Sequence, residues 1–464
     1  MIYIGTILSL CFIVAVAYAL THKYNPQTVL LVAGILMLGL SLVLGTYHIN
    51  TATDLGGTAT GWIGFDLFRF VKQTMSTNML RVGLMIMTIG GYVAYMKKIH
   101  ASDALVYVSM RPLMLFRRFP DVAAILMLPI GQMLFVCTPS AAGLGLLLVV
   151  SIFPILVNLG VSRLTAVSII SACTIFDMGP GSANTARAAE LAGMTNMEYF
   201  VEHQLPLTIP ITILLMLVYY FTNRYYDRKD REKGNATDEP TVQTSDMKVE
   251  APLIYAILPA LPLLLLIIFS SYFQVFGRPI VLDTTTAMII SLFVALTFEL
   301  IRYRSFTETL NQVKAFWQGM GNVFANVVTL IIAAEIFSRG LISLGFIDSL
   351  VEGCTSLGFN GVLISVVIIV IIFLAAILMG SGNASFFSFG PLVPDIAGKV
   401  GMNPVDMILP MQLSSSMGRA ISPIAGVIVA IAEVAGVSTN ELVKRNAIPL
   451  TVGLLAMMFV HYIL

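Results

Sequence analysis

Long apolar segments, each close to the length needed to cross a lipid bilayer, follow one another along most of this chain. A membrane-spanning helix requires about 20 predominantly apolar residues. Segments of suitable length and character are residues 2–20, 29–44, 79–95, 164–191, 205–221, 252–270, 284–301, 321–338, 406–432 and 447–463. The pattern therefore predicts an all-α polytopic membrane protein with about ten transmembrane helices.

Two further apolar segments, residues 121–157 and 361–398, are too long for one span, and each has a polar, glycine-bearing break near its centre. The second break reads MGSGNASFFSF, residues 379–389. Irregular backbone survives at membrane depth only where protein or a wet cavity satisfies its polar groups. We therefore expect two re-entrant hairpins, each returning to the side that it entered. The alternative is a packing seam of small residues between helices.

The two halves of the chain repeat one order of elements. In each half the hairpin is followed by an apolar segment that is broken at its middle, by FDMGPGSANTA within 164–191 and by SMGRAISPIAG within 406–432. Asp103 and Asp348 are equivalent at an offset of 245 residues, which also pairs Thr138 with Asn383 at the hairpin tips. Two inverted-topology repeats with broken helices are typical of secondary transporters, whose site lies near the membrane midplane.

The distribution of charge divides and orients the chain. Residues 223–250 form the one long hydrophilic segment, predicted to be a partly disordered linker between a first half, 1–222, and a second half, 251–464. Eighteen of the 26 Lys and Arg residues fall on the same side of the predicted topology as this linker. Because such residues are enriched in cytoplasmic loops, that side is predicted to be cytoplasmic. Hairpin 121–157 then enters from the cytoplasm and hairpin 361–398 from outside.

The four breaks are predicted to converge and to bind the substrate. A helix N-terminus at a break suits an anion, and the guanidinium fork of Arg419 suits a carboxylate. A charge at the membrane centre costs about 3 kcal/mol, so Arg419 is expected to be functional. The alternative role of Arg419 is an internal salt bridge to Asp177. The substrate-binding candidates are Thr138, Ser140, Ser182, Asn184, Thr185, Ser381, Asn383, Ser385, Arg419 and Ser422.

Candidates for coupling transport to an ion are Asp177, Glu335 and Asn383, with Na⁺ held at Ser381 and Asn383 as one arrangement and H⁺ as the other. No other cofactor or metal is expected. An enzyme is not expected either, because the five histidines fall in loops or at an end and supply no base for a serine hydrolase built on Gly181–Ser182. The expected partners are a small solute and membrane lipid, not nucleic acid.

Several stretches of the second half resemble the DcuC family of anaerobic C4-dicarboxylate carriers. They are FANVVTLIIAAEIF (324–337), GSGNASFFSF (380–389), GRAISPIAGVIVA (418–430) and ELVKRNAIP (441–449), and PSAAGLGLLL (139–148) is similar in placement in the first half. The resemblance implies the ion-transporter-type fold, a homodimer with elevator-type movement, and uptake, exchange or efflux of fumarate, succinate, malate or aspartate across the bacterial inner membrane. The residues themselves leave open a carrier for another small organic anion or amino acid, or an anion channel.

Overall fold

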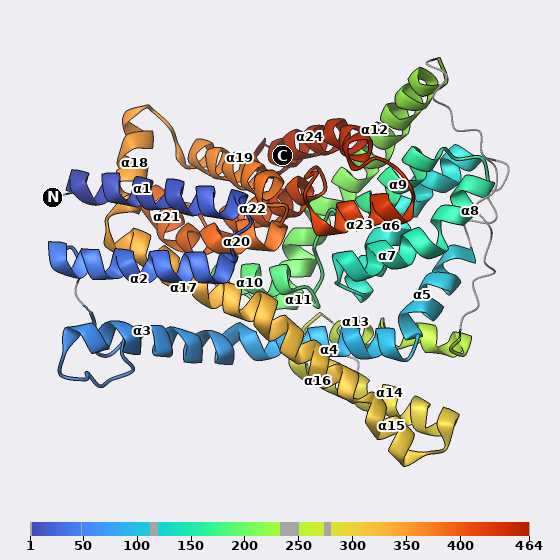
Figure 1. Ribbon diagram of the computed structural model, residues 1–464, viewed down its shortest axis with the longest axis horizontal. Coiled ribbons are helices and arrows are strands. Elements are labelled where there is room, and N and C mark those ends of the chain that lie inside the picture. The colour runs from blue at the N-terminus through green and yellow to red at the C-terminus, as the bar shows by residue number, and fades with distance from the viewer. Residues whose placement is uncertain (1, 48, 112–118, 233–249, 273–279, 464) are drawn as a thin grey trace.

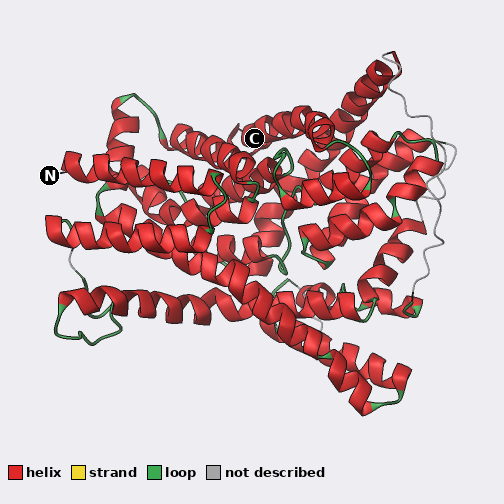
Figure 2. Ribbon diagram, in the orientation of Figure 1, coloured by secondary structure: helices red, strands yellow, loops and turns green. Residues whose placement is uncertain are grey.

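The computed structural model describes residues 2–47, 49–111, 119–232, 250–272 and 280–463. Over these residues the chain consists of helices joined by loops, without a strand (Figure 2). Ten of the described helices are long and apolar enough to cross a membrane. The predicted all-α polytopic fold is confirmed.

The first half contains two outer helices, a long helix with a π-helical turn at its middle, a hairpin, and a helix that is broken before it resumes. The bounds are α1 (Ile2–Thr21), α2 (Pro26–Leu44), α3 (Ile63–Asn78), the π-helical η1 (Met79–Gly83), α4 (Leu84–Lys98), α5 (Ala101–Met110), α6 (Pro120–Cys137), α7 (Ala141–Ser151), α8 (Phe153–Asn158), α9 (Arg163–Ala172), α10 (Ala183–Ala192), α11 (Asn196–Glu198), the π-helical η3 (Tyr199–Gln204) and α12 (Leu205–Glu232).

The second half repeats this order of elements. The bounds are the 3₁₀ turn η4 (Leu253–Ile257), α13 (Leu261–Ile268), α14 (Thr284–Tyr303), α15 (Phe306–Gln312), α16 (Lys314–Val323), the π-helical η5 (Phe324–Val328), α17 (Thr329–Ser343), α18 (Phe346–Ser356), α19 (Gly361–Met379), α20 (Gly382–Phe389), the 3₁₀ turn η6 (Gly390–Leu392), α21 (Val393–Val400), α22 (Pro404–Arg419), α23 (Gly426–Val434) and α24 (Thr439–Ile463).

The long helices of the two halves run in opposite directions. In Figure 1 the chain passes from left to right along α3 and α4, and from right to left along α16 and α17. Helix α4 packs against α16, and further contacts occur in pairs that are related by exchange of the halves. The contact of α2 with α17 corresponds to that of α14 with α4. The contact of α1 with α18 corresponds to that of η4 with α5. The two halves are therefore inverted repeats.

The two hairpins point toward each other from opposite ends of the molecule. Figure 1 shows α6 and α7 on the right and α19 and α20 on the left. Each tip ends in a serine that caps the following helix, because the Ser140 Oγ accepts a hydrogen bond from the Gly143 N–H (3.2 Å) and the Ser381 Oγ accepts one from the Ala384 N–H (3.2 Å). At the second tip Gly380 adopts a φ of 66°, which a glycine tolerates without strain.

The number of residues that separates equivalent positions of the two halves changes between the start of α5 and α18 and the hairpin tips. Helices α5 and α18 begin 245 residues apart, at Ala101 and Phe346, but the capping serines Ser140 and Ser381 are 241 residues apart. The predicted pairing of Thr138 with Asn383 is therefore wrong by four residues. The cause is the connection before the first hairpin, residues 111–119, which is longer than its counterpart, residues 357–360.

Some predicted spans differ from the observed helices. Residues 252–270 form two short helical pieces, because Pro259 and Pro262 interrupt the ladder of backbone hydrogen bonds. The apolar spans 79–95 and 321–338 belong to longer continuous helices, residues 63–98 and 306–343.

The predicted linker begins later than residue 223, because α12 continues to Glu232, where Asp227 and Asp230 pair with Arg445 (2.6 and 2.7 Å). Residues 233–249 lie outside the described part of the chain.

Helices α2 and α17 approach closely because a glycine on each faces the other. A Cβ built on Gly34 would lie 2.7 Å from the Ile336 carbonyl carbon and 2.7 Å from the Phe337 nitrogen. A Cβ on Gly340 would lie 2.9 Å from the Met37 Cβ and 3.1 Å from the Gly34 carbonyl oxygen. Such contact between small residues is the usual way in which helices pack inside a membrane.

Replacing Gly34 by alanine is expected to lower the thermal unfolding temperature in detergent, because backbone atoms of α17 cannot move aside as a flexible side chain would. Overpacking of this kind costs about 1–3 kcal/mol. The control is Gly39→Ala on the same helix, where the new Cβ would meet only the Leu67 Cδ2 at 4.0 Å. Equal unfolding temperatures for the two variants would contradict the close packing.

Candidate functional site

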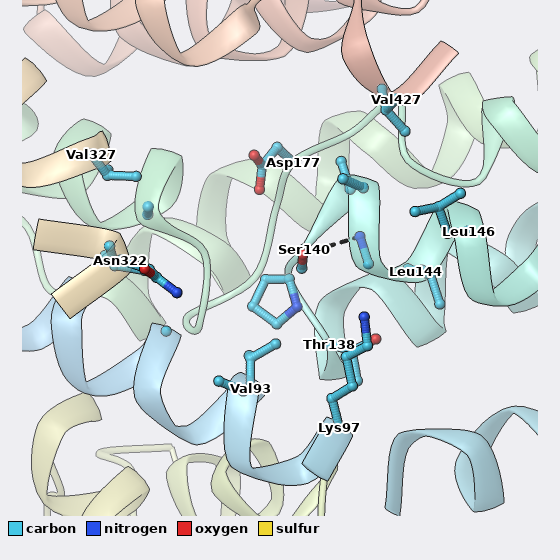
Figure 3. Close-up of a pocket in the computed structure, with 18 of the residues that line it drawn as sticks. Val93, Lys97, Thr138, Ser140, Leu144, Leu146, Asp177, Asn322, Val327 and Val427 are labelled. Atoms are coloured by element: carbon cyan, nitrogen blue, oxygen red, sulfur yellow. Dashed lines mark hydrogen bonds between the residues drawn. The ribbon is translucent and has the colours of Figure 1, made fainter. Parts of the chain in front are cut away.

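A cavity of about 890 Å³ lies where both hairpin tips and both broken helices meet (Figure 3). One wall is formed by the two tips, the breaks and the first residues of the helices that follow them. The opposite wall is formed by α4, α5, α16 and η5, with Val93, Lys97 and Asn322 among its residues. The site therefore lies between the tips and the long crossing helices.

Six of the residues predicted from sequence line this cavity. They are Thr138, Ser140, Asp177, Ser381, Asn383 and Arg419. The first three come from the first half and the last three from the second, from elements that the chain separates by up to about 280 residues. The predicted convergence of the four breaks is what the structure shows.

Four helices begin at the cavity. The first residues of α7, α10, α20 and α23 all line it, among them Ala141, Ala183, Gly382 and Gly426. Each helix N-terminus carries unpaired N–H groups and about half a positive charge. Such ends bind carboxylates and phosphates directly, so the arrangement favours an anion in the cavity.

Asp177 is the carboxylate of the first break, and two residues that follow it hold its side chain in place. The Ser182 hydroxyl donates to Oδ1 (2.6 Å) and the Asn184 Nδ2 donates to Oδ2 (2.9 Å). The same Asn184 amide lies 3.1 Å from the Asn383 Oδ1, which belongs to the opposite hairpin tip. Ser182 and Asn184 therefore do not line the cavity themselves. They hold Asp177, and Asn184 connects it to the second hairpin tip.

Two buried glutamines, which sequence reasoning missed, satisfy the backbone of the first break. The Gln412 Nε2 donates to the Asp177 carbonyl (2.7 Å), and the Gln204 Oε1 accepts from the Gly179 N–H (3.0 Å). The two side chains also bond to each other at 3.0 Å. A signal was present, since Gln412 is an uncharged polar residue within the predicted span 406–432, where it needs an internal partner, and Gln204 directly precedes the span 205–221.

Arg419 ends α22 and connects the two broken helices. Its Nη2 donates to the Thr174 carbonyl (2.6 Å), and its Nε is buried without a hydrogen-bond partner in the described structure. Asp177 and Arg419 both line the cavity, but no ion pair within 4 Å joins them among the described residues. The salt bridge that was the alternative role of Arg419 is not formed in this conformation, and part of its guanidinium remains available.

Three other candidates do not reach the cavity. Thr185 exchanges hydrogen bonds with Gln204 (3.0 and 3.3 Å). The Ser385 hydroxyl donates to the Gly382 carbonyl (2.9 Å), and the Ser422 hydroxyl donates to the Ile377 carbonyl (2.6 Å). Ser385 and Ser422 thus satisfy backbone carbonyls, and Thr185 helps to hold the Gln204 side chain at the first break.

Glu335 lies in a separate cavity of about 200 Å³. There it pairs with Arg187, which also pairs with Glu190 at 2.5 Å. The i, i+3 pair of Arg187 and Glu190 agrees with their spacing on α10. Glu335 is thus joined to the broken helix but does not line the larger cavity.

This fold and site define a polytopic membrane transporter built from inverted repeats. The model of the family described as "DcuC: C4-dicarboxylate anaerobic carrier" matches residues 4–464. The chain belongs to the DcuC family, as its sequence resemblance indicated. It is a multi-pass transporter of the bacterial inner membrane.

Curated relatives agree over almost the whole length. The anaerobic C4-dicarboxylate transporter DcuC of Shigella flexneri is 32% identical over 452 residues, covering 97% of this chain and 95% of that protein. The probable anaerobic C4-dicarboxylate transporter DcuC of Vibrio cholerae is 33% identical over 441 residues, covering 95% and 93%. Among solved structures, MtrF of Neisseria gonorrhoeae, which is described as illuminating a class of antimetabolite efflux pumps, superposes with a TM-score of 0.61 at 15% identity. The match covers 95% of this chain and 96% of that chain. This last likeness shows a shared fold.

Replacing Asn383 by alanine is expected to raise the half-saturating substrate concentration several-fold while leaving the unfolding temperature close to that of the wild type. Its side chain lines the cavity and, among the described residues, accepts one side-chain hydrogen bond, from Asn184, so little packing is lost. Saturation of uptake in proteoliposomes measures the effect. The matched control is Ser385→Ala on the same short helix, whose hydroxyl faces a backbone carbonyl and should leave the half-saturating concentration unchanged. Similar shifts in both variants would contradict the cavity role.

Proposed function

We propose that this transporter moves C4-dicarboxylates such as fumarate, succinate, malate and aspartate across the inner membrane, by uptake, exchange or efflux. The observation that carries the proposal is the meeting of four helix N-termini and Arg419 around one cavity. The names of the relatives support the same substrate class.

The charge of the substrate explains why such a site is needed. A dicarboxylate carries about two negative charges at neutral pH, and moving them into the membrane interior without compensation is unfavourable. Four helix ends of about half a charge each offset much of this charge. Arg419 adds a full cation whose planar fork matches one carboxylate bidentately. The hydroxyls of Thr138, Ser140 and Ser381 supply further polar contacts.

Movement of the site is proposed to follow the division between the two walls. The tips and broken helices form one group, braced internally by Arg419, Gln412 and Asn184. The long helices containing α4 and α16 cross each other and form the opposite wall. Displacement of the first group along the second would expose the cavity alternately, in an elevator-type cycle, and a homodimer would anchor the long helices.

A coupling cation is proposed to share the site. The Asp177 carboxylate can take up a proton, and the oxygens of Ser381 and Asn383 are ligands of the type that Na⁺ prefers. No group of three His, Cys, Asp or Glu side chains suited to a metal ion occurs in the described ranges. Arg419 lies on the same cavity wall as Asp177, so a proton on Asp177 would strengthen the net positive charge offered to a dianion.

Asp177→Asn is expected to abolish pH-driven accumulation of succinate while leaving succinate exchange measurable, because the amide mimics the protonated acid but cannot release a proton. Uptake into proteoliposomes with an imposed pH gradient, compared with counterflow, separates the two activities. Glu335→Gln is the control, since Glu335 lies outside the larger cavity. Unaltered pH-driven uptake in Asp177→Asn would contradict Asp177 as the proton site. Wild-type uptake that depends on external sodium and not on the pH gradient would assign the coupling to Na⁺.

Arg419→Lys is expected to raise the half-saturating concentration of dicarboxylates about tenfold, because lysine keeps the charge but loses the bidentate fork. Lysine can still donate a hydrogen bond to the Thr174 carbonyl, so the fold should be retained. Arg419→Ala should impair transport of dianions more severely than of any monoanion. A panel of mono- and dicarboxylates in counterflow measures this ratio.

The double variant Arg419→Ala with Asp177→Ala distinguishes substrate binding from charge balance within the protein. If Arg419 only neutralises Asp177, removal of both charges should restore much of the activity. Substantial recovery in folded protein would therefore overturn the proposed contact between Arg419 and the substrate.

A further inference from the structure

Lys97, which is not among the binding residues predicted from the sequence, lies in the wall of the larger cavity. It is in the last turn of α4, and Figure 3 shows its side chain extending toward the hairpin tip at Thr138. In that view Thr138 and Ser140 lie between Lys97 and Asp177. A cation therefore borders the path that leads from the polar tips to the α5 end of the cavity.

Lys97 has no acidic partner within ion-pair distance among the residues that the structure describes. The nearest carboxylate on the cavity wall along the chain, Asp103, pairs with His100 at 2.7 Å. His100 pairs in turn with Glu250 at 3.1 Å. The ammonium of Lys97 thus remains available to a ligand, whereas Asp103 is already engaged.

The inverted repeat provides no equivalent cation on the other side. Helices α4 and α17 end at Lys98 and Ser343, and α5 and α18 begin at Ala101 and Phe346, so the equivalent of Lys97 is Ile342. Ile342 is an apolar side chain packed against the main core. When the site faces the opposite end of the molecule, the corresponding wall position therefore carries no charge.

We infer that Lys97 is a second cationic binding residue for the dianion, used only when the site is open toward the α5 end, which is the predicted cytoplasmic side. The inference rests on the proposed function. Lys97 belongs to the long-helix wall, so its attraction is lost once the tips move away from it. The consequence is a difference between the two sides. Removal of Lys97 should weaken dicarboxylate binding from the α5 side and leave binding from the opposite side unchanged.

The experiment compares Lys97→Gln with Lys98→Gln in right-side-out and inverted membrane vesicles, using counterflow of labelled succinate. Lys98 is the matched control because it has the same charge and the same helix turn but does not line the cavity. Lys97→Gln should raise the half-saturating concentration about threefold to tenfold from the α5 side, as expected for one partly screened charge. The rise should shrink at high ionic strength, and Lys97→Arg should restore binding.

The outcomes separate this inference from the function on which it rests. An equal change from both sides, or the same change in Lys98→Gln, overturns the role of Lys97 while wild-type counterflow still supports a dicarboxylate carrier. Absence of succinate counterflow in the wild type overturns the proposed function and this inference with it. Retained unfolding temperatures show that the variants are folded.

Discussion

The structure depends on satisfying backbone groups that two helices leave open in the middle of the membrane. Between α9 and α10, and again between α22 and α23, the chain gives up its helical hydrogen bonds where water cannot replace them. At the first break Gln204 and Gln412 bond to the Gly179 N–H and the Asp177 carbonyl. At the second, the Asn446 Nδ2 donates to the Ala420 carbonyl (3.0 Å). Without these amides the open backbone would be prohibitively costly to bury.

The same bonds join the two halves of the repeat into one body. Arg419 and Gln412, both on α22, bond to carbonyls of the first break, and Asn184 reaches the second hairpin tip. Each half therefore completes the site of the other, and neither could form the cavity alone. The helix ends that become free at the breaks are then directed at a shared space, which is the basis of the proposed anion site.

Symmetry accounts for the architecture, and departures from it account for the chemistry. Asp177, Arg419 and Lys97 each occur in one half only, and Arg187 of the first half pairs with Glu335 of the second. An exactly symmetric carrier would treat its two sides alike. A chain that places its charges unequally can bind, couple and release a dianion differently on the two sides of the membrane.

The sequence by itself determined the class of fold, the hairpins, the repeat and six of the ten polar or charged residues that line the cavity, because membrane insertion demands long apolar runs and makes every polar interruption conspicuous. The sequence could not determine the exact offset between the two repeats or which side chains contact one another. The four-residue error at the hairpin tips came from a longer connection before α6, which no periodicity reports. Thr185, Ser385 and Ser422 are as polar in sequence as Ser140 and Asn383, and only the packing directs them to the Gln204 side chain and to backbone carbonyls rather than to the cavity. Likewise, only the tertiary structure separated Arg419 from Asp177, paired Glu335 with Arg187, and brought Lys97 to the cavity, since each of these depends on contacts between helices distant in the chain.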